Sequence, residues 1–165
     1  MSRVPPDVVV RELTAADLPR LEVLERDLFG PAAWSPASLA AELVTEGRWY
    51  VGAAVPATGL LVGYAGLWFD GDDAQVMTIA VDSQHQDRGI ARTMLDRLVD
   101  HARGLGADRV LLEVRVDNDP AIHLYESTGF RRLGRRRAYY QPGNVDAWTM
   151  LLPLRVAAPA GPEPR

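Results

Sequence analysis

Two side chains in the middle of this sequence could move protons during a reaction. Glu113 lies in the apolar run "VLLEVRV", where a carboxylate costs free energy unless it is paired with a neighbouring arginine such as Arg115 or faces a cavity. At a cavity, Glu113 would be suited to general-base work. Tyr125, in "AIHLYESTGF", could donate its phenolic proton to a departing anion. It could equally be a core residue at helical spacing with Ile122.

The stretch "QHQDRGIARTML", residues 84–95, could bind a phosphate group. It follows a predicted strand that ends at Val81, and it changes at Ile90 into apolar residues at helical spacing. The first N–H groups of a helix have no partner inside the helix, and the positive end of the helix dipole lies beside them. Gly89 leaves room for a ligand to approach the backbone, and Ala91 keeps the next turn small. The alternative is that this loop is only a connection.

Asn118 stands where a predicted strand gives way to a helix that starts at Asp119 and Pro120. Its side chain could cap that helix, which is the usual role of asparagine at such a position. It could also hold a ligand that carries amide groups. Both interpretations stay open from the sequence.

The apolar spacing predicts the elements that would position these residues. After an N-terminal strand, leucines from Leu18 to Leu28 predict one helix, and "WSPASLAAELVTEG" predicts a second. Three strands follow, then a long helix from about Arg88 to Leu105, the strand of Glu113, a short helix and two final strands. The predicted fold class is therefore α/β, a single domain in the order β-α-α-β-β-β-α-β-α-β-β. Its mixed, mostly antiparallel sheet would have helices on both faces.

The uncharged run at residues 49–69 is about as long as the roughly 20 residues that span a bilayer. The turn-like "PATG" interrupts it, and the pieces on either side are short and rich in β-branched and aromatic residues. These features favour a β-hairpin, so we expect no membrane span.

Composition limits the chemistry and the partners. The chain has 165 residues, no cysteine and a formal net charge of −4, which excludes disulfides and a cysteine nucleophile and gives no reason to expect nucleic acid. The histidines are dispersed without metal-ligand spacing, so no metal is expected. We expect a cytoplasmic protein, because the N-terminus has no apolar run typical of a signal peptide. The predicted domain covers residues 1–154, and residues 155–165 form an Ala/Pro-rich tail that we expect to be disordered.

Three segments together resemble a known family. "TIAVDSQHQDRGIARTML", "LLEVRVDNDPAIHLYESTGF" and "RRRAYYQPGNVDAWTM", in this order and spacing, resemble the GCN5-related N-acetyltransferases. Within that superfamily they are similar to the RimI-type enzymes, which acetylate the N-terminal alanine of a ribosomal protein. The resemblance covers roughly residues 8–152. One departure is "GNVDA" at residues 143–147, where Val145 stands in place of the usual acidic residue and puts the peptide preference in question.

The resemblance implies a set of site residues and acetyl-CoA as cosubstrate. Glu113 would be the general base and Tyr125 the general acid. The residues that bind acetyl-CoA would be Ile79, Ala80, Val81, Gln86, Asp87, Arg88, Gly89, Ile90, Ala91 and Asn118. The residues that bind the acceptor would be Trp34, Ser35, Tyr139 and Tyr140.

The implied reaction is transfer of an acetyl group to the N-terminal α-amine of a protein, by direct attack in a ternary complex. Two alternatives stay open: an acetyltransferase for a small-molecule amine or another peptide, and an acyl-CoA-binding module without turnover. The arginine-rich segment at residues 131–137 is expected to be a solvated strand and turn, with an approach to ribosomal RNA or CoA phosphate as the other interpretation.

Overall fold

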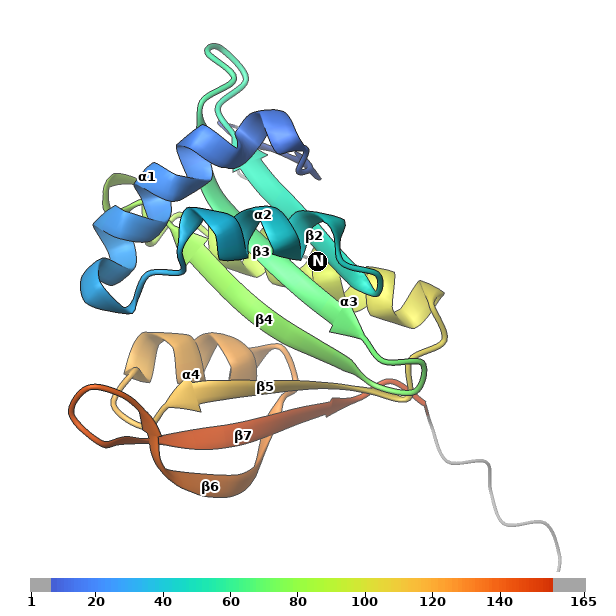
Figure 1. Ribbon diagram of the computed structural model, residues 1–165. Helices are drawn as coiled ribbons and strands as arrows, with labels where there is room; N and C mark the ends of the chain where they lie inside the picture. The colour runs from blue at the N-terminus through green and yellow to red at the C-terminus, as the bar shows by residue number, and fades with distance from the viewer. Residues whose placement is uncertain (1–6, 156–165) are drawn as a thin grey trace, which may run out of the picture.

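One mixed sheet organises residues 7–155, which are the part of the chain that the computed structural model describes (Figure 1). The sheet has seven strands in the order β1-β2-β3-β4-β5-β7-β6. The strands are β1 (Val9–Glu12), β2 (Arg48–Ala54), β3 (Leu61–Phe69), β4 (Ala74–Val81), β5 (Arg109–Arg115), β6 (Arg131–Tyr140) and β7 (Val145–Pro153). The α-helices are α1 (Leu18–Phe29), α2 (Pro36–Val44), α3 (Ile90–Gly104) and α4 (Asp119–Ser127).

The order of elements confirms the sequence prediction. The uncharged run is the β2–β3 hairpin, paired antiparallel from Arg48 and Trp68 to Ala54 and Leu61. Within residues 7–155, no helix is long and apolar enough to cross a bilayer. Neighbouring strands pair antiparallel throughout except for β4 and β5, which are parallel. The prediction of a disordered tail concerns residues that, apart from Arg155, lie outside the described part.

Two apolar clusters hold the helices against the sheet. On one face, Leu21 and Leu24 of α1 and Leu39 of α2 pack over Tyr64 of β3. On the other face, the apolar side of α3 packs against the central strands, and its residues at four-residue spacing are at most 2% exposed: Ile90, Met94, Leu98 and Ala102. Burial of each large apolar side chain contributes about 1.5–3 kcal/mol. The fold therefore rests on helices packed on both faces of the sheet.

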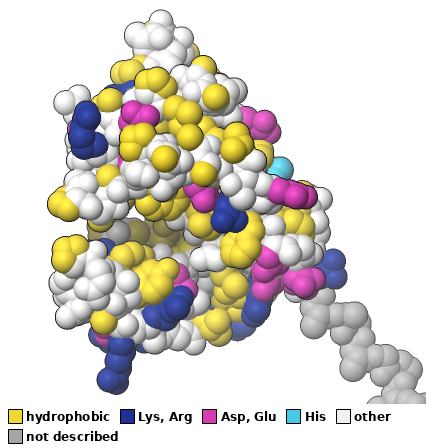
Figure 2. Space-filling view, viewed as in Figure 1, with side chains coloured by type: hydrophobic (Ala, Val, Ile, Leu, Met, Phe, Trp, Pro, Cys, Tyr) yellow, Lys and Arg dark blue, Asp and Glu magenta, His cyan; other side chains and the backbone are white. Residues whose placement is uncertain are grey.

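The sheet opens between β4 and β5. These strands pair only near their starts, where Ala74 and Gln75 lie beside Val110 and Leu111, and they diverge toward their ends (Figure 1). Met77 is an extra residue in the pairing of β4 with β3, and such a bulge bends a strand. The space-filling view shows a hollow in the surface between the two parts of the sheet (Figure 2).

Candidate active site

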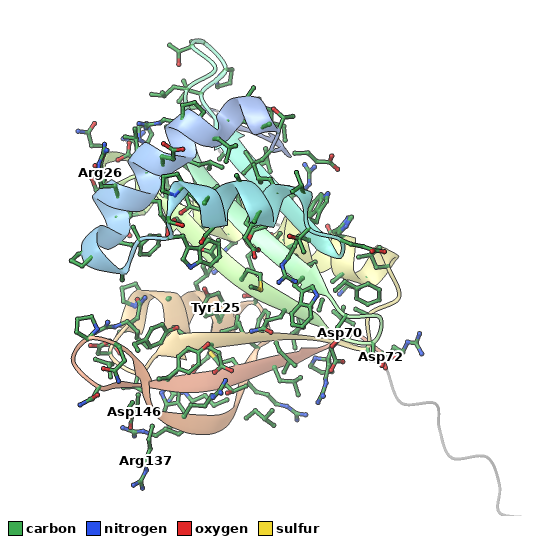
Figure 3. All side chains as sticks on the ribbon, in the orientation of Figure 1. Arg26, Asp70, Asp72, Tyr125, Arg137 and Asp146 are labelled. Atoms are coloured by element: carbon green, nitrogen blue, oxygen red, sulfur yellow. The ribbon has the colours of Figure 1, made fainter. Side chains whose placement is uncertain are left out.

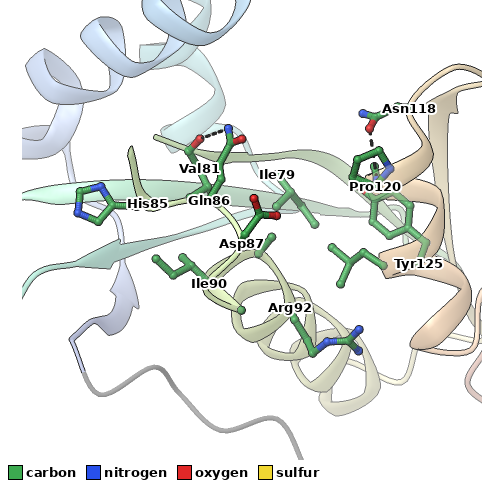
Figure 4. A pocket seen from close by; sticks show the side chains of 14 residues that line it. Ile79, Val81, His85, Gln86, Asp87, Ile90, Arg92, Asn118, Pro120 and Tyr125 are labelled. Carbon is green, nitrogen blue, oxygen red and sulfur yellow. Dashed lines mark hydrogen bonds between the residues drawn. The ribbon is translucent and has the colours of Figure 1, made fainter. Parts of the chain in front are cut away.

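The first half of the opening is a cavity of about 320 Å³ between the end of β4, the start of α3 and α4 (Figure 4). Among the residues predicted to bind the cosubstrate, all except two line it. Ala80 packs instead in the cluster beneath α1 and α2. Arg88 points to Asp7, with 3.4 Å between guanidinium and carboxylate. We call this space the cofactor cavity; it also includes Arg92 and His85, which the sequence did not single out as ligand-binding residues.

The backbone turns sharply just before the start of α3. Asp87 and Gly89 have left-handed φ angles of 61° and 79°, and the helix proper begins at Ile90. Gln86 holds the loop in place because its side-chain amide donates to the carbonyl of Val81 at 3.0 Å (Figure 4). Such a turn at a helix N-terminus is a favourable place for an anion. The geometry therefore fits a diphosphate group.

The exposed edge of β4 fits the rest of an extended cosubstrate. Beyond Gln75 this strand has no pairing with β5, so the backbone edge of β4 on that side is free, and Ile79 lines the cavity. Asn118 lies across from it, and its side-chain oxygen accepts from the N–H of Ala121 at 3.3 Å. This confirms the capping interpretation. The same side chain lines the cavity, and its NH₂ group can still donate to an amide-bearing ligand.

The second half of the opening is a cavity of about 490 Å³, which we call the acceptor cavity. Its walls are α1 and the connection to α2, the strands β4 and β5, α4, and the end of β6. Ile79 and Tyr125 line both cavities, so the two spaces meet beside them. Tyr125 comes from α4 at the lower side of the opening (Figure 3).

Three of the residues predicted to bind the acceptor line this cavity: Trp34, Tyr139 and Tyr140. The rings of the two tyrosines meet edge to face, with 5.0 Å between centroids. Ser35 does not line it. The Ser35 hydroxyl caps α2 instead, because it accepts from the N–H of Ser38 at 3.1 Å.

Glu113 lines the acceptor cavity and is also paired. Its side chain is 13% exposed and lies 3.3 Å from the guanidinium of Arg136. Its other oxygen accepts from the hydroxyl of Thr149 at 2.7 Å. Arg115, the example of a possible partner that the sequence offered, pairs instead with Asp117 at 3.0 Å. Arg136 and Thr149 reach Glu113 from the neighbouring strands β6 and β7, which spacing along one strand does not reveal.

Burial keeps both phenols near the junction in their protonated form. Tyr125 is 9% exposed, and loss of solvation raises its pKa to about 12. Burial, followed by the nearby Tyr139, raises the pKa of Tyr140 to about 12. The Tyr140 hydroxyl donates to the backbone carbonyl of Glu113 at 3.2 Å, whereas Tyr125 packs against Phe130. Tyr125 is thus a protonated donor at the place where the cavities join.

The sequence analysis missed a second carboxylate in the acceptor cavity. Glu25 of α1 is 4% exposed and accepts from the N–H of Trp34 at 2.9 Å. The hydroxyl of Tyr64 donates to its other oxygen. Burial raises the pKa of Glu25, and the bond from Trp34 partly opposes this shift. Its position four residues after Leu21, on the apolar side of the predicted helix, was a signal that could have identified it.

The divided sheet has a helix start suited to an anion on one side and a carboxylate-lined cavity on the other, an arrangement that can hold two substrates side by side, as transfer of a group between them requires. Residues 15–130 match the family model described as the acetyltransferase (GNAT) family. The chain belongs to this family, which confirms the resemblance found in the sequence.

Curated proteins and a solved structure agree with this assignment. The chain is 46% identical over 148 residues to N-alpha-acetyltransferase RimI of Mycobacterium tuberculosis, covering 87% of this chain and 90% of that protein. It is 33% identical to the [ribosomal protein bS18]-alanine N-acetyltransferase of Escherichia coli, covering 88% and 97%. The crystal structure of the ribosomal-protein-S18-alanine N-acetyltransferase from Escherichia coli matches with a TM-score of 0.82 at 31% identity, covering 92% and 96%.

Proposed function

We propose that this protein transfers an acetyl group from acetyl-CoA to the N-terminal α-amine of a protein, and that its acceptor is the N-terminal alanine of a ribosomal protein. The observation that carries the proposal is the meeting of two cavities at Ile79 and Tyr125, with Glu113 on the acceptor side. The similarity to relatives named for alanine N-acetylation supports the choice of acceptor. With a ribosomal protein as acceptor, the protein would act in the cytoplasm. Residues 1–154 would form its single N-acetyltransferase domain.

Glu113 would remove a proton from the acceptor amine. An α-amine has a pKa of about 8 and is mostly protonated at pH 7, yet only the neutral amine can attack a thioester. A carboxylate that Arg136 and Thr149 hold in position can accept that proton directly or through a water molecule. The two contacts use only part of the hydrogen-bonding capacity of the two carboxylate oxygens, so further lone pairs can bind the substrate amine.

Tyr125 would complete the transfer. Acetyl-CoA supplies the acetyl thioester, and attack by the amine releases CoA as a thiolate. Tyr125 carries a proton at neutral pH, as any phenol with a pKa of about 10 or above does, and burial raises its pKa to about 12. It can donate this proton to the sulfur as the thiolate leaves. The chain has no cysteine that could form an acyl-enzyme, and direct transfer between the two bound substrates is therefore the mechanism we propose.

A panel of acceptors tests this function. CoA release from acetyl-CoA would be measured with short peptides that differ in their first two residues, together with free amines such as polyamines. Mass spectrometry of the products would then locate the acetyl group. We expect rapid acetylation at the α-amine of peptides that begin with alanine. Reaction with free amines alone would contradict the proposed acceptor, and acetyl-CoA binding without any turnover would favour a binding module.

A further inference from the structure

Glu25 is a buried carboxylate that the proposed proton transfers do not use. It is 4% exposed, and both of its hydrogen-bond partners, the backbone N–H of Trp34 and the hydroxyl of Tyr64, are uncharged groups. Burial of a carboxylate costs free energy that such bonds offset only in part. A leucine at this position would extend the apolar side of α1, which Leu21 and Leu24 already form. The carboxylate therefore calls for an explanation beyond packing.

The contacts of Glu25 connect the wall of the acceptor cavity to the sheet. Trp34 lies in the short connection between Ala32, at the end of a 3₁₀ turn, and Pro36, where α2 begins. This connection has no ladder of backbone hydrogen bonds of its own, so the bond from the Trp34 N–H to Glu25 fixes its position. On the other side, Tyr64 belongs to β3 in the middle of the sheet. Glu25 thus holds the connection against a rigid element.

We propose that Glu25 is a positioning residue for the acceptor: it fixes Trp34 as a wall of the acceptor cavity, so that the substrate N-terminus is aligned with Glu113. This inference rests on the proposed function, because the acceptor cavity is the site it concerns. The two carboxyl oxygens of Glu25 accept one bond each, from the Trp34 N–H and from the Tyr64 hydroxyl. One side chain therefore joins the connection to the central sheet.

The matched variants are Glu25→Ala, Glu25→Gln and Glu42→Ala. Alanine removes the acceptor of the Trp34 N–H, whereas glutamine keeps an oxygen at the same place. Glu42 of α2 is the control, because it also accepts from a tyrosine hydroxyl of the sheet, that of Tyr50, at 2.6 Å. It does not line the acceptor cavity. A general loss of stability would affect Glu25→Ala and Glu42→Ala alike.

Steady-state kinetics with an alanine-initiated peptide should separate these variants. We expect Glu25→Ala to raise the KM for the peptide about tenfold, at the upper end of the range for losing one hydrogen bond, with the KM for acetyl-CoA and kcat nearly unchanged. Glu25→Gln should recover most of the affinity, and Glu42→Ala should keep the peptide KM of the parent protein. Equal effects of the two alanine variants, or failure of glutamine to restore the KM, would overturn the proposal.

A second measurement does not depend on activity. Amide hydrogen exchange over residues 30–38 should become about tenfold faster in Glu25→Ala and should stay close to the parent rate in Glu25→Gln. Unchanged exchange in Glu25→Ala would overturn the positioning role. If the parent protein acetylates no peptide, the proposed acceptor fails, while this exchange measurement still decides whether Glu25 holds the connection.

Discussion

The cofactor cavity and the acceptor cavity are built by different means. The first is lined by two continuous segments, residues 79–92 and 118–125, and it presents a strand edge and a helix start. The second gathers residues from α1 and its connection to α2, from β4 and β5, from α4, and from the end of β6. The positions of backbone groups depend on chain conformation rather than on side-chain identity. The first cavity should therefore tolerate most substitutions except those that change its backbone conformation. In the second cavity, single side chains should decide rate and selectivity.

The largest effect is expected at Glu113, on the acceptor side. Glu113→Gln removes the proposed base and should lower kcat by about 100-fold or more, as general-base catalysis typically contributes. The Kd for acetyl-CoA, measured by calorimetry, should stay unchanged. Asp117→Asn is the control, because Asp117 pairs with Arg115 on the surface and should leave kcat intact. Retention of activity in Glu113→Gln would show that Glu113 is not the general base.

Tyr125, at the junction of the cavities, should have the next effect. Tyr125→Phe should lower kcat about tenfold, a smaller loss than at Glu113 because a thiolate, whose thiol has a pKa of about 8.5, is already a fair leaving group. Burial raises the pKa of Tyr125 to about 12, so the phenol keeps its proton until pH rises toward that value. The kcat of the parent protein should therefore not fall between about pH 7 and pH 10. A decline in that range that disappears in Tyr125→Phe would contradict this assignment.

A backbone change should disturb the cofactor cavity alone. Gly89 has a φ of 79°, and a Cβ there would meet no atom of the described residues within 4 Å. Gly89→Ala therefore brings strain of about 1–2 kcal/mol without a clash, and we expect it to weaken acetyl-CoA binding about fivefold.

The matched control is Gly59→Ala, in the β2–β3 turn. Gly59 has a φ of 72° and equally open surroundings, so both variants should lose similar thermal stability. Only Gly89→Ala should change the Kd for acetyl-CoA, whereas the peptide KM should stay near the parent value in both. A similar loss of acetyl-CoA affinity in Gly59→Ala would show that strain anywhere in the fold has this effect.

An effect as small as that at Gly89 is expected at Thr149, which holds the Glu113 carboxylate. Thr149→Val keeps the shape of the side chain but removes its hydroxyl donor, and it should lower kcat about fivefold, equivalent to a hydrogen bond of about 1 kcal/mol. Thr149→Ser should restore the rate. If Thr149 acts through Glu113, then Thr149→Val should have no further effect in a Glu113→Gln background. An additive loss in the double variant would show an independent role.

Apolar spacing predicted the order of elements because helices and strands bury apolar residues at regular intervals where the helices pack on the sheet. The long helix was predicted from about Arg88, whereas α3 begins at Ile90, because the left-handed Asp87 and Gly89 keep the preceding residues out of the helix. The divergence of β4 from β5 follows from pairing between distant segments. Local spacing does not encode it, and only the family resemblance indicated a site there.

The two cavities also differed in how well the sequence predicted them. The cofactor cavity lies in continuous motifs, and its predicted residues line it apart from Ala80 and Arg88. The acceptor cavity depends on contacts across strands and between elements. For this reason the sequence offered Arg115 as a possible partner of Glu113 and did not indicate Arg136, and Glu25 was missed. The sequence did not predict contacts between side chains that come from different elements and meet only in the folded protein.

The most direct test of the two-cavity account is a crystal structure with a conjugate that joins CoA to a peptide beginning with alanine. The account predicts the diphosphate at the backbone of residues 87–91. It also predicts the junction of CoA and alanine between Ile79 and Tyr125, and the peptide beside Trp34 and Tyr139. A peptide that leaves the junction by another route, away from Glu113, would contradict it.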